Sequence, residues 1–352
     1  MRTARNQDGP GTTLGSADRS TLCGPDVAMT PIARDGANHL RYRAIFPNAV
    51  GTGVIIQSSG PICDATRTRL IQLIEDFEAT LSRFREDSLV GLMSRATHGG
   101  AFDFPEWSSP LFDLTDRFVD LAGGRLDPCV GEDLMRLGYG SDLTFRMAAD
   151  APDHLGSLHG RPTWEHDVVR NGTTLRTRGP LHLDFGLCGK GFLVDLMTSV
   201  LLDEDPGREF LVNAGGDMRA RADEPLAVGL EDPRDEDAGV GVARLSSGAL
   251  CASSPSRRHW RASAALEAHH LINALDGMPV TDVAATWTHV PDRDGDGREI
   301  AYPTATADGL ATALFLLPVE ALLPLLPFSC LTLSADLHAT IGGDFPGTVF
   351  TS

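Results

Sequence analysis

The sequence predicts an α+β fold, and three observations support this. Segments with helical and with strand-like patterns alternate irregularly along the 352 residues, whereas a doubly wound sheet would show regular alternation. The hydrophobic fraction of 42% is that of an ordinary globular protein with a sizeable core. Glycine-rich corners punctuate the chain where several of these segments end.

The N-terminal residues and the longest apolar stretch indicate which part of the chain folds and whether it enters a membrane. Residues 1–40 are rich in small and polar types, which predicts a flexible leader before one folded domain at 41–352. No signal-peptide core is present, and Cys23 lacks the apolar run of a lipoprotein signal, so we expect a cytoplasmic protein. Prolines and a glutamate interrupt the apolar stretch 310–326, so no membrane insertion is expected.

Helices are predicted where apolar residues recur at helical spacing. Residues 63–83 show this pattern, and a second helix is expected over 109–122, where Gly123 and Gly124 end it. Further helices are expected after the glycine-rich loop 186–191, as far as Leu201, and over 308–317.

Strands are predicted in the remaining apolar or alternating segments. The first covers residues 41–57 and is interrupted by three residues at 51–53. Residues 138–180 are turn-rich and predict short strands and loops. The other expected strands lie at 181–185, 210–213, within 221–250, and around 270–273.

The charge limits the function classes. The chain has 48 acidic and 30 basic residues, a net charge of −18, which disfavours nucleic acids and anionic membranes as partners. An anionic ligand would therefore need a local source of positive charge: a metal ion, a helix N-terminus or an isolated basic side chain. The single lysine of the chain, Lys190, lies between two glycines and is a candidate for that role.

Two familiar kinds of metal site are not expected. The six cysteines are scattered without CxxC pairs, so neither structural zinc nor a dense disulfide framework is expected. The run at 292–297 imitates the start of a calcium loop, but Pro303 stands where the twelfth-position glutamate belongs. We interpret this run as a solvated loop.

Residues 184–191 form the most informative glycine-rich corner, because a predicted strand, a loop and a helix follow one another there. Backbone N–H groups at such a helix start can bind phosphate, and Lys190 would add a positive charge. The segment is not a Walker A loop, since the required spacing and the Ser or Thr after the lysine are missing.

Asp308 and Thr312 are four residues apart on a predicted helix, so their oxygens share one face. With a carbonyl from elsewhere they could form part of a Mg²⁺ shell. From spacing alone, a helix-capping or surface aspartate beside a core-facing threonine is the more ordinary alternative. Likewise, one residue of the pair His269-His270 should face inwards, where a hydrogen-bonded core histidine is more common than a catalyst.

Seven segments in order resemble the ApbE family, the FAD:protein FMN transferases. Residues 212–217, Val-Asn-Ala-Gly-Gly-Asp, match that family's motif, and Asp308–Leu314 resembles its Asp-Ala-Leu-Ala-Thr-Ala-Leu. The other matching segments are residues 49–52, 82–88, 124–131, 184–195 and 270–280. Together they fall within about residues 44 to 317.

The resemblance implies a T-fold-like, single α+β domain with mixed, largely antiparallel sheets flanked by helices. It implies Mg²⁺ at Asp308, Thr312 and the Gly189 carbonyl. Within the implied reaction, His270 is the candidate general base, because the pKa of imidazole suits proton removal near neutrality, and Lys190 either assists or only braces the loop. The resemblance also implies FAD-contacting residues: Val50, Phe84, Gly124, Arg125, Leu126, Asp127, Leu187, Lys190 and Asp195.

The implied reaction splits FAD, transfers FMN to a Thr or Ser hydroxyl of an acceptor flavoprotein and releases AMP. The alternatives are a Mg²⁺-dependent FAD pyrophosphatase and a catalytically weak FAD-binding protein. Asn273 and Ala274 stand where the family has Asp-Pro. If the missing carboxylate orients His270, Asn273 should slow turnover; if the amide orients the imidazole equally well, it should not.

Overall fold

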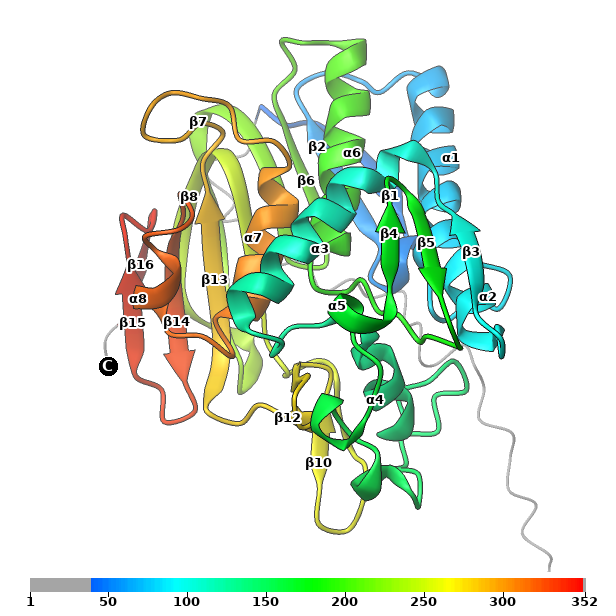
Figure 1. Ribbon diagram of the computed structural model, residues 1–352. Helices are drawn as coiled ribbons and strands as arrows, with labels where there is room; N and C mark the ends of the chain where they lie inside the picture. Colours follow the sequence, from blue (N-terminus) through cyan, green and yellow to red (C-terminus); the bar gives the residue numbers. More distant parts are fainter. Residues whose placement is uncertain (1–38, 351–352) are drawn as a thin grey trace, which may run out of the picture.

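The computed structural model describes residues 39–350 (Figure 1). Of the predicted leader, residues 1–38 lie outside the described residues.

A large antiparallel sheet forms the centre of the fold. Its path runs β1-β2-β6-β7-β8-β13-β14-β15, and β16 also pairs with β8. The strands are β1 (Tyr42–Phe46), β2 (Val54–Ser58), β6 (Phe210–Ala214), β7 (Asp217–Asp232), β8 (Asp235–Ser253), β13 (Val283–Val290), β14 (Ser329–Ser334), β15 (Ala339–Gly342) and β16 (Gly347–Val349). Neighbours in the chain therefore mostly pair by hairpins, while β2 and β6 pair although residues 59–209 lie between them in the sequence.

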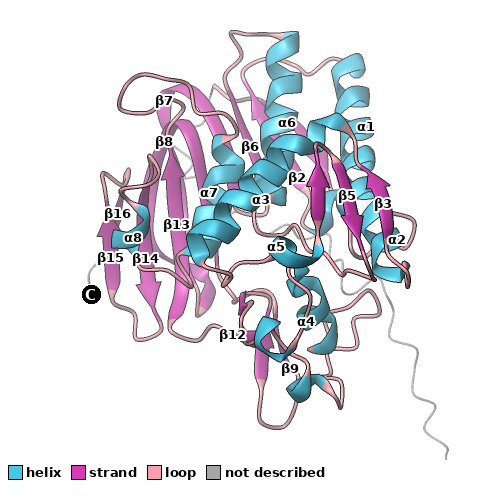
Figure 2. Ribbon diagram, viewed as in Figure 1, coloured by secondary structure: helices cyan, strands magenta, loops and turns pink. Residues whose placement is uncertain are grey.

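Helices cover one face of this sheet (Figure 2). Helices α6 (Gly189–Glu204) and α7 (Pro303–Ala313) pack against each other and on the strands, α1 (Asp64–Leu81) packs on α6, and α3 (Ser109–Ala122) packs on α7. The shorter helices are α2 (Leu89–Arg95), α4 (Gly131–Arg136), α5 (Trp164–Asp167) and α8 (Val319–Leu322). The N-terminus of α6 and the middle of α7 thus meet above the sheet.

Three small sheets lie beside the main one. Strands β3 (Gly100–Asp103), β5 (Thr174–Thr177) and β4 (Val169–Asn171) pair in that order. Two hairpins follow β8: β9 (His259–Arg261) with β10 (Glu267–His269), and β11 (Ile272–Asn273) with β12 (Met278–Pro279). In Figure 1 these hairpins lie below the helical layer, next to α4.

The core is divided by the pleat of the sheet. Alternate residues of β8 point to opposite faces, so Ala249 and Cys251 join the apolar cluster under α7, while Leu250 joins a separate cluster on the other face. Both clusters are buried, which explains why this strand has an almost continuous apolar sequence at its end.

The predicted α+β fold with largely antiparallel sheets is confirmed, and it forms a single domain. The helix expected over 109–122 has those bounds, whereas the one expected over 308–317 starts earlier and ends sooner, as α7. The strand predicted at 181–185 is wrong. Its backbone bonds to loops, with Leu181 N donating to Met93 O and Asp184 N to Pro128 O, so no ladder forms.

The helices of the described residues bear on the prediction that the chain is not inserted into a membrane. None of those in residues 39–350 is long and apolar enough to cross a bilayer.

Candidate active site

Three charged residues from separate elements meet above the sheet and are called the Lys190 cluster: Lys190 of α6, Asp217 of β7 and Asp308 of α7. Lys190 Nζ lies 2.8 Å from Asp217 Oδ2 and 3.0 Å from Asp308 Oδ1. The Gly191 N–H donates to Asp308 Oδ2 over 3.0 Å, so the start of α6 also holds this carboxylate. Both carboxylates are 1% exposed, while the lysine side chain is 24% exposed and reaches solvent.

The electrostatics of the Lys190 cluster are unbalanced, since two carboxylates share one ammonium. Burial works against the charge of Lys190, but Asp217 and Asp308 outweigh it and raise the pKa of the ammonium. Burial, together with the charge of Asp217, raises the pKa of Asp308 above its usual range. Asp308 is buried in the middle of α7, so the alternative of an aspartate that caps its own helix or lies on the surface is wrong.

The oxygen donors here fit a hard divalent cation. Asp217 Oδ1 is buried and has no hydrogen-bond partner among the described residues, and the excess negative charge would be neutralised by a cation. Gly189 directly precedes Lys190, and Thr312 follows Asp308 by about one turn of α7. Residues 39–350 contain no cluster of three or more His, Cys, Asp or Glu side chains arranged for a metal. A Mg²⁺ ion would thus depend on carbonyl, hydroxyl and water oxygens besides carboxylate.

The two adjacent histidines have different environments. His269 Nε2 is 2.9 Å from Val280 O, and its Nδ1 accepts from Leu271 N, so this imidazole is a hydrogen-bonded structural residue. His270 lies in the bend between β10 and β11, and its Nδ1 is buried with no hydrogen-bond partner among the described residues. Burial, followed by the charges of Arg258 and Lys190, lowers the pKa of His270 to about 3. The imidazole is thus neutral at pH 7 with a nitrogen that has no partner, but a pKa this low makes it a weak base in the free protein.

Asn273 is engaged in its own hairpin. Its Oδ1 accepts from Leu275 N over 3.1 Å, and its carbonyl accepts from Gly277 N. The neighbouring Ala274 N–H donates to Arg125 O over 2.9 Å, a bond that the family's proline could not make. The hairpin is thereby tied to the predicted FAD-contacting segment at 124–127.

The glycine-rich loop at 184–191 is anchored by an ion pair. Arg83 Nε lies 2.6 Å from Asp184 Oδ2, and Asp184 Oδ1 accepts from Gly186 N. Although burial works against ionisation, Arg83 holds the pKa of Asp184 below its usual value. The same guanidinium lies over the exposed ring of Phe84, 4.1 Å from its centroid. Phe84 is thus presented to solvent beside the loop, as a ring that stacks on a ligand would be.

A second buried ionic group, the Arg161 cluster, consists of Arg161, Asp127 and Asp133. Arg161 Nε lies 2.7 Å from Asp133 Oδ2, and its Nη2 donates to Ala274 O. Asp127 accepts from the N–H groups of Cys129 and Trp164. The side chain of Asp127 therefore fixes the turn after Leu126, and its role as an FAD contact stays a prediction.

Four further predicted FAD contacts lie in different surroundings. Asp195 is buried and accepts from Thr304 and Ala305 at the start of α7, so it positions the helix that carries Asp308. Val50 has a left-handed φ of 47°, which is rare for a β-branched residue. Gly124, with φ of 78°, faces Leu275, and Leu187 is half-buried between two core clusters.

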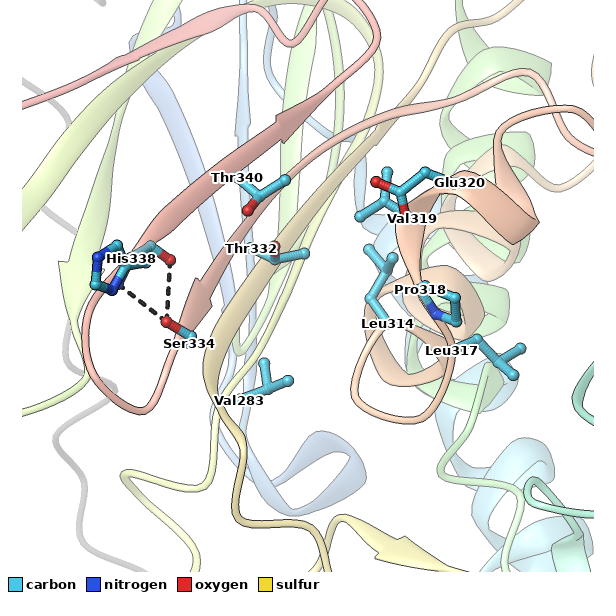
Figure 3. Close-up of a pocket in the computed structure, with 10 residues that line it drawn as sticks. All are labelled: Val283, Leu314, Leu317, Pro318, Val319, Glu320, Thr332, Ser334, His338 and Thr340. Atoms are coloured by element: carbon cyan, nitrogen blue, oxygen red, sulfur yellow. Dashed lines mark hydrogen bonds between the residues drawn. The ribbon is translucent and has the colours of Figure 1, made fainter.

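One cavity, of about 260 Å³, lies away from these groups. It is bounded by the end of α7, α8 and strands β13 to β15, with Leu314, Val319, Thr332 and Thr340 among its lining residues (Figure 3). It contains none of the predicted site residues.

Sequence reasoning missed three residues that build the site. Asp217 ends the motif at 212–217 and could have been suspected from that position, because a carboxylate after a glycine turn projects from a strand start. Arg83 lies inside the resembling segment 82–88, and Arg161 gives no sequence signal.

The chain is similar to one known protein family. Residues 50–330 match the sequence model of the ApbE family. No curated protein matches the chain. Among solved structures, the ApbE protein of Thermotoga maritima is similar at 21% identity and a TM-score of 0.71, covering 86% of this chain and 96% of its own.

Two other solved structures are also similar to this chain. A histidine-to-glycine mutant of the flavin transferase ApbE from Vibrio cholerae is 19% identical at a TM-score of 0.68, with 86% and 97% covered. The apo flavinyl transferase ApbE of Pseudomonas stutzeri is 18% identical at 0.64, with 85% and 95% covered. At these identities the structures show a common fold, and the family model covers most of the chain. The chain belongs to the ApbE family.

Proposed function

We propose that this protein is a Mg²⁺-dependent FAD:protein FMN transferase that moves FMN from FAD to a Thr or Ser hydroxyl of an acceptor flavoprotein and releases AMP. Family membership and the flavin transferases among the similar structures support it. The observation that carries the proposal is the Lys190 cluster, whose surplus carboxylate charge at the start of α6 suits a cation that binds pyrophosphate.

The chain's own groups would hold the two charged parts of the reaction. Lys190 and the N-terminus of α6 would face the pyrophosphate of FAD, and a bound cation would neutralise the surplus negative charge of Asp217 and Asp308. Asp308, Thr312 and the Gly189 carbonyl would hold Mg²⁺, which supplies Lewis-acid stabilisation of phosphate charge when bound. Phosphoryl transfer depends mainly on such positioning and charge neutralisation.

His270 would remove the proton from the acceptor hydroxyl. The hydroxyl oxygen then forms a bond to the FMN phosphorus as the bond to the AMP oxygen breaks. His270 is neutral at pH 7, as a base must be, and the approach of the anionic pyrophosphate would raise its pKa from the low value of the free protein.

FAD would lie along three adjacent segments. We assign its adenine and pyrophosphate to the region of Phe84, residues 124–127 and the loop 184–191, with Val50, Leu187 and Asp195 as further predicted contributors. The hydrogen bond from Ala274 to Arg125 supports this, because it brings the segment after His270 next to the segment at 124–127.

The test measures AMP release and protein-bound flavin with FAD, Mg²⁺ and a Thr-bearing acceptor domain. A transferase gives equal amounts of AMP and protein-bound FMN, and both stop when Mg²⁺ is chelated. AMP with only free FMN would instead identify a pyrophosphatase. Stoichiometric FAD binding without AMP would identify a binding protein.

The histidine pair offers a matched control. His270→Ala should lower FMN transfer by about 10²–10⁴-fold while FAD still binds, because removal of a general base typically has that effect. His269→Gln should keep transfer within about threefold of wild type, since His269 bonds to Val280 and not to a reacting group. Transfer by His270→Ala at the wild-type rate would remove His270 from the mechanism.

A further inference from the structure

A half-buried glutamate on α1 contacts the strained turn that carries Val50. Glu78 Oε1 accepts a hydrogen bond from Val50 N over 2.7 Å, across 28 residues of sequence. Val50 has φ 47° and ψ 31°, in the left-handed region that disfavours β-branched residues. Such a conformation persists only where surrounding contacts enforce it.

The turn at 49–53 is also stabilised by its own hydrogen bonds and by contact with a second loop. The N–H groups of Thr52 and Gly53 donate to Ala49 O at 3.1 and 2.9 Å. The Thr52 side chain lies against Gly215, where an added Cβ would come within 2.8 Å of it. Gly215 belongs to the β6–β7 corner, two residues before Asp217 of the Lys190 cluster.

These contacts form a continuous path from α1 to the candidate site. Glu78 accepts a hydrogen bond from Val50, and the side chain of Thr52 in the same turn contacts Gly215. Gly215 lies in the β6–β7 corner, which also contains Asp217. Strands β2 and β6 pair with each other, and helix α1 contacts the turn at residues 49–51. Packing alone does not lock Val50, whose side chain is only partly buried at the edge of the core.

We propose that Glu78 is a positioning residue, which keeps Val50 left-handed and thereby holds the turn at 49–53 in place at the FAD site and against the corner of Asp217. The inference rests on the proposed function, because Val50 is a predicted FAD contact. Glu78 is not a catalytic residue, since it would act on FAD through the turn.

The experiment compares five variants by FAD dissociation constant, measured from flavin fluorescence, and by kcat and KM for AMP release. Glu78→Ala should weaken FAD binding and raise KM about tenfold, with a smaller change in kcat. Glu78→Gln keeps an oxygen acceptor and should stay within about threefold of wild type. Glu75→Ala, on the same helix with an ion pair to Arg85, is the matched control and should bind FAD like wild type.

The double variant Glu78→Ala/Val50→Gly provides the rescue. Glycine adopts positive φ without steric cost, so the restraint becomes unnecessary. The double variant should bind FAD within about threefold of Val50→Gly alone. Wild-type affinity in Glu78→Ala would overturn the inference, and so would a failure of Val50→Gly to rescue it.

Amide hydrogen exchange of residues 49–53 separates this inference from the proposed function. Exchange should be faster in Glu78→Ala than in wild type and Glu78→Gln, whether or not FAD is bound. If wild type fails to bind FAD, the proposed function fails, while exchange still reports on the restraint. Unchanged exchange in Glu78→Ala would overturn the restraint itself.

Discussion

The Lys190 cluster and the Arg161 cluster contain the same charges, one cation and two carboxylates, but they differ in how completely those charges are satisfied. Arg161 bonds to Asp133 and to the carbonyls of Pro162 and Ala274, and its side chain is fully buried. In the Lys190 cluster, the ammonium is partly exposed and Asp217 Oδ1 has no hydrogen-bond partner among the described residues.

The difference distinguishes a structural charge group from a site. In the Arg161 cluster the backbone N–H groups of Cys129, Trp164 and Gly156 bond to the carboxylates, so three loops are joined and little binding capacity remains. In the Lys190 cluster one buried carboxylate oxygen, Asp217 Oδ1, remains without a hydrogen-bond partner among the described residues. An incompletely satisfied buried polar group is costly, and its retention suggests a ligand.

The largest expected effect is on the stability conferred by the Arg161 cluster. Arg161→Met leaves two buried carboxylates without their cation and should lower the free energy of unfolding by about 3–5 kcal/mol. Arg261→Met, in an exposed pair with Glu267, should cost at most about 1 kcal/mol. Urea denaturation measures both, and a loss below 1 kcal/mol for Arg161→Met would make the two clusters alike.

The Lys190 cluster should show the opposite behaviour. Asp308→Ala removes the charged Mg²⁺ ligand that we propose, worth several kcal/mol to the reaction, and should slow AMP release at least about a hundredfold. Stability should be unchanged or higher, because the repulsion between Asp308 and Asp217 is removed. Wild-type AMP release by this variant would contradict the metal assignment.

The pH dependence of stability gives a second test of the Arg161 cluster. Burial raises the pKa of Asp133 to about 6, above the ordinary 3.8, so between these values the native protein holds a proton that the unfolded chain has lost. Acidification from pH 7 to 4 should therefore stabilise wild type relative to Asp133→Asn, by on the order of 2 kcal/mol. Denaturation curves of both proteins at several pH values measure this difference, and parallel pH profiles would show that Asp133 is ionised throughout.

The smallest effect is expected at Asn273, where the sequence differs from the ApbE family pattern. Asn273→Asp should change AMP release by less than about threefold, because the Oδ1 of either residue can accept from Leu275 N. Steady-state kinetics with FAD decide this. A tenfold gain would show that the family carboxylate orients His270.

The parts of the fold that follow local rules were predictable. The spacing of apolar residues and the two glycines fixed the helix at 109–122, and the order of the family segments brought Lys190 and Asp308 into one hypothesis. What depends on distant partners was not predictable. Residues 181–185 look like a strand, but their backbone groups bond to loops, and the partners of Asp127 belong to segments that no local pattern connects.

Because Lys190 is the single lysine of the sequence, selective ¹⁵N labelling of lysine would give one side-chain ammonium resonance for the whole protein. The ion pairs with Asp217 and Asp308 keep that amine protonated at neutral pH and slow its exchange with water. Its chemical shift would report the occupancy of the cluster directly, so titrations of cation or nucleotide could be followed without any engineered label.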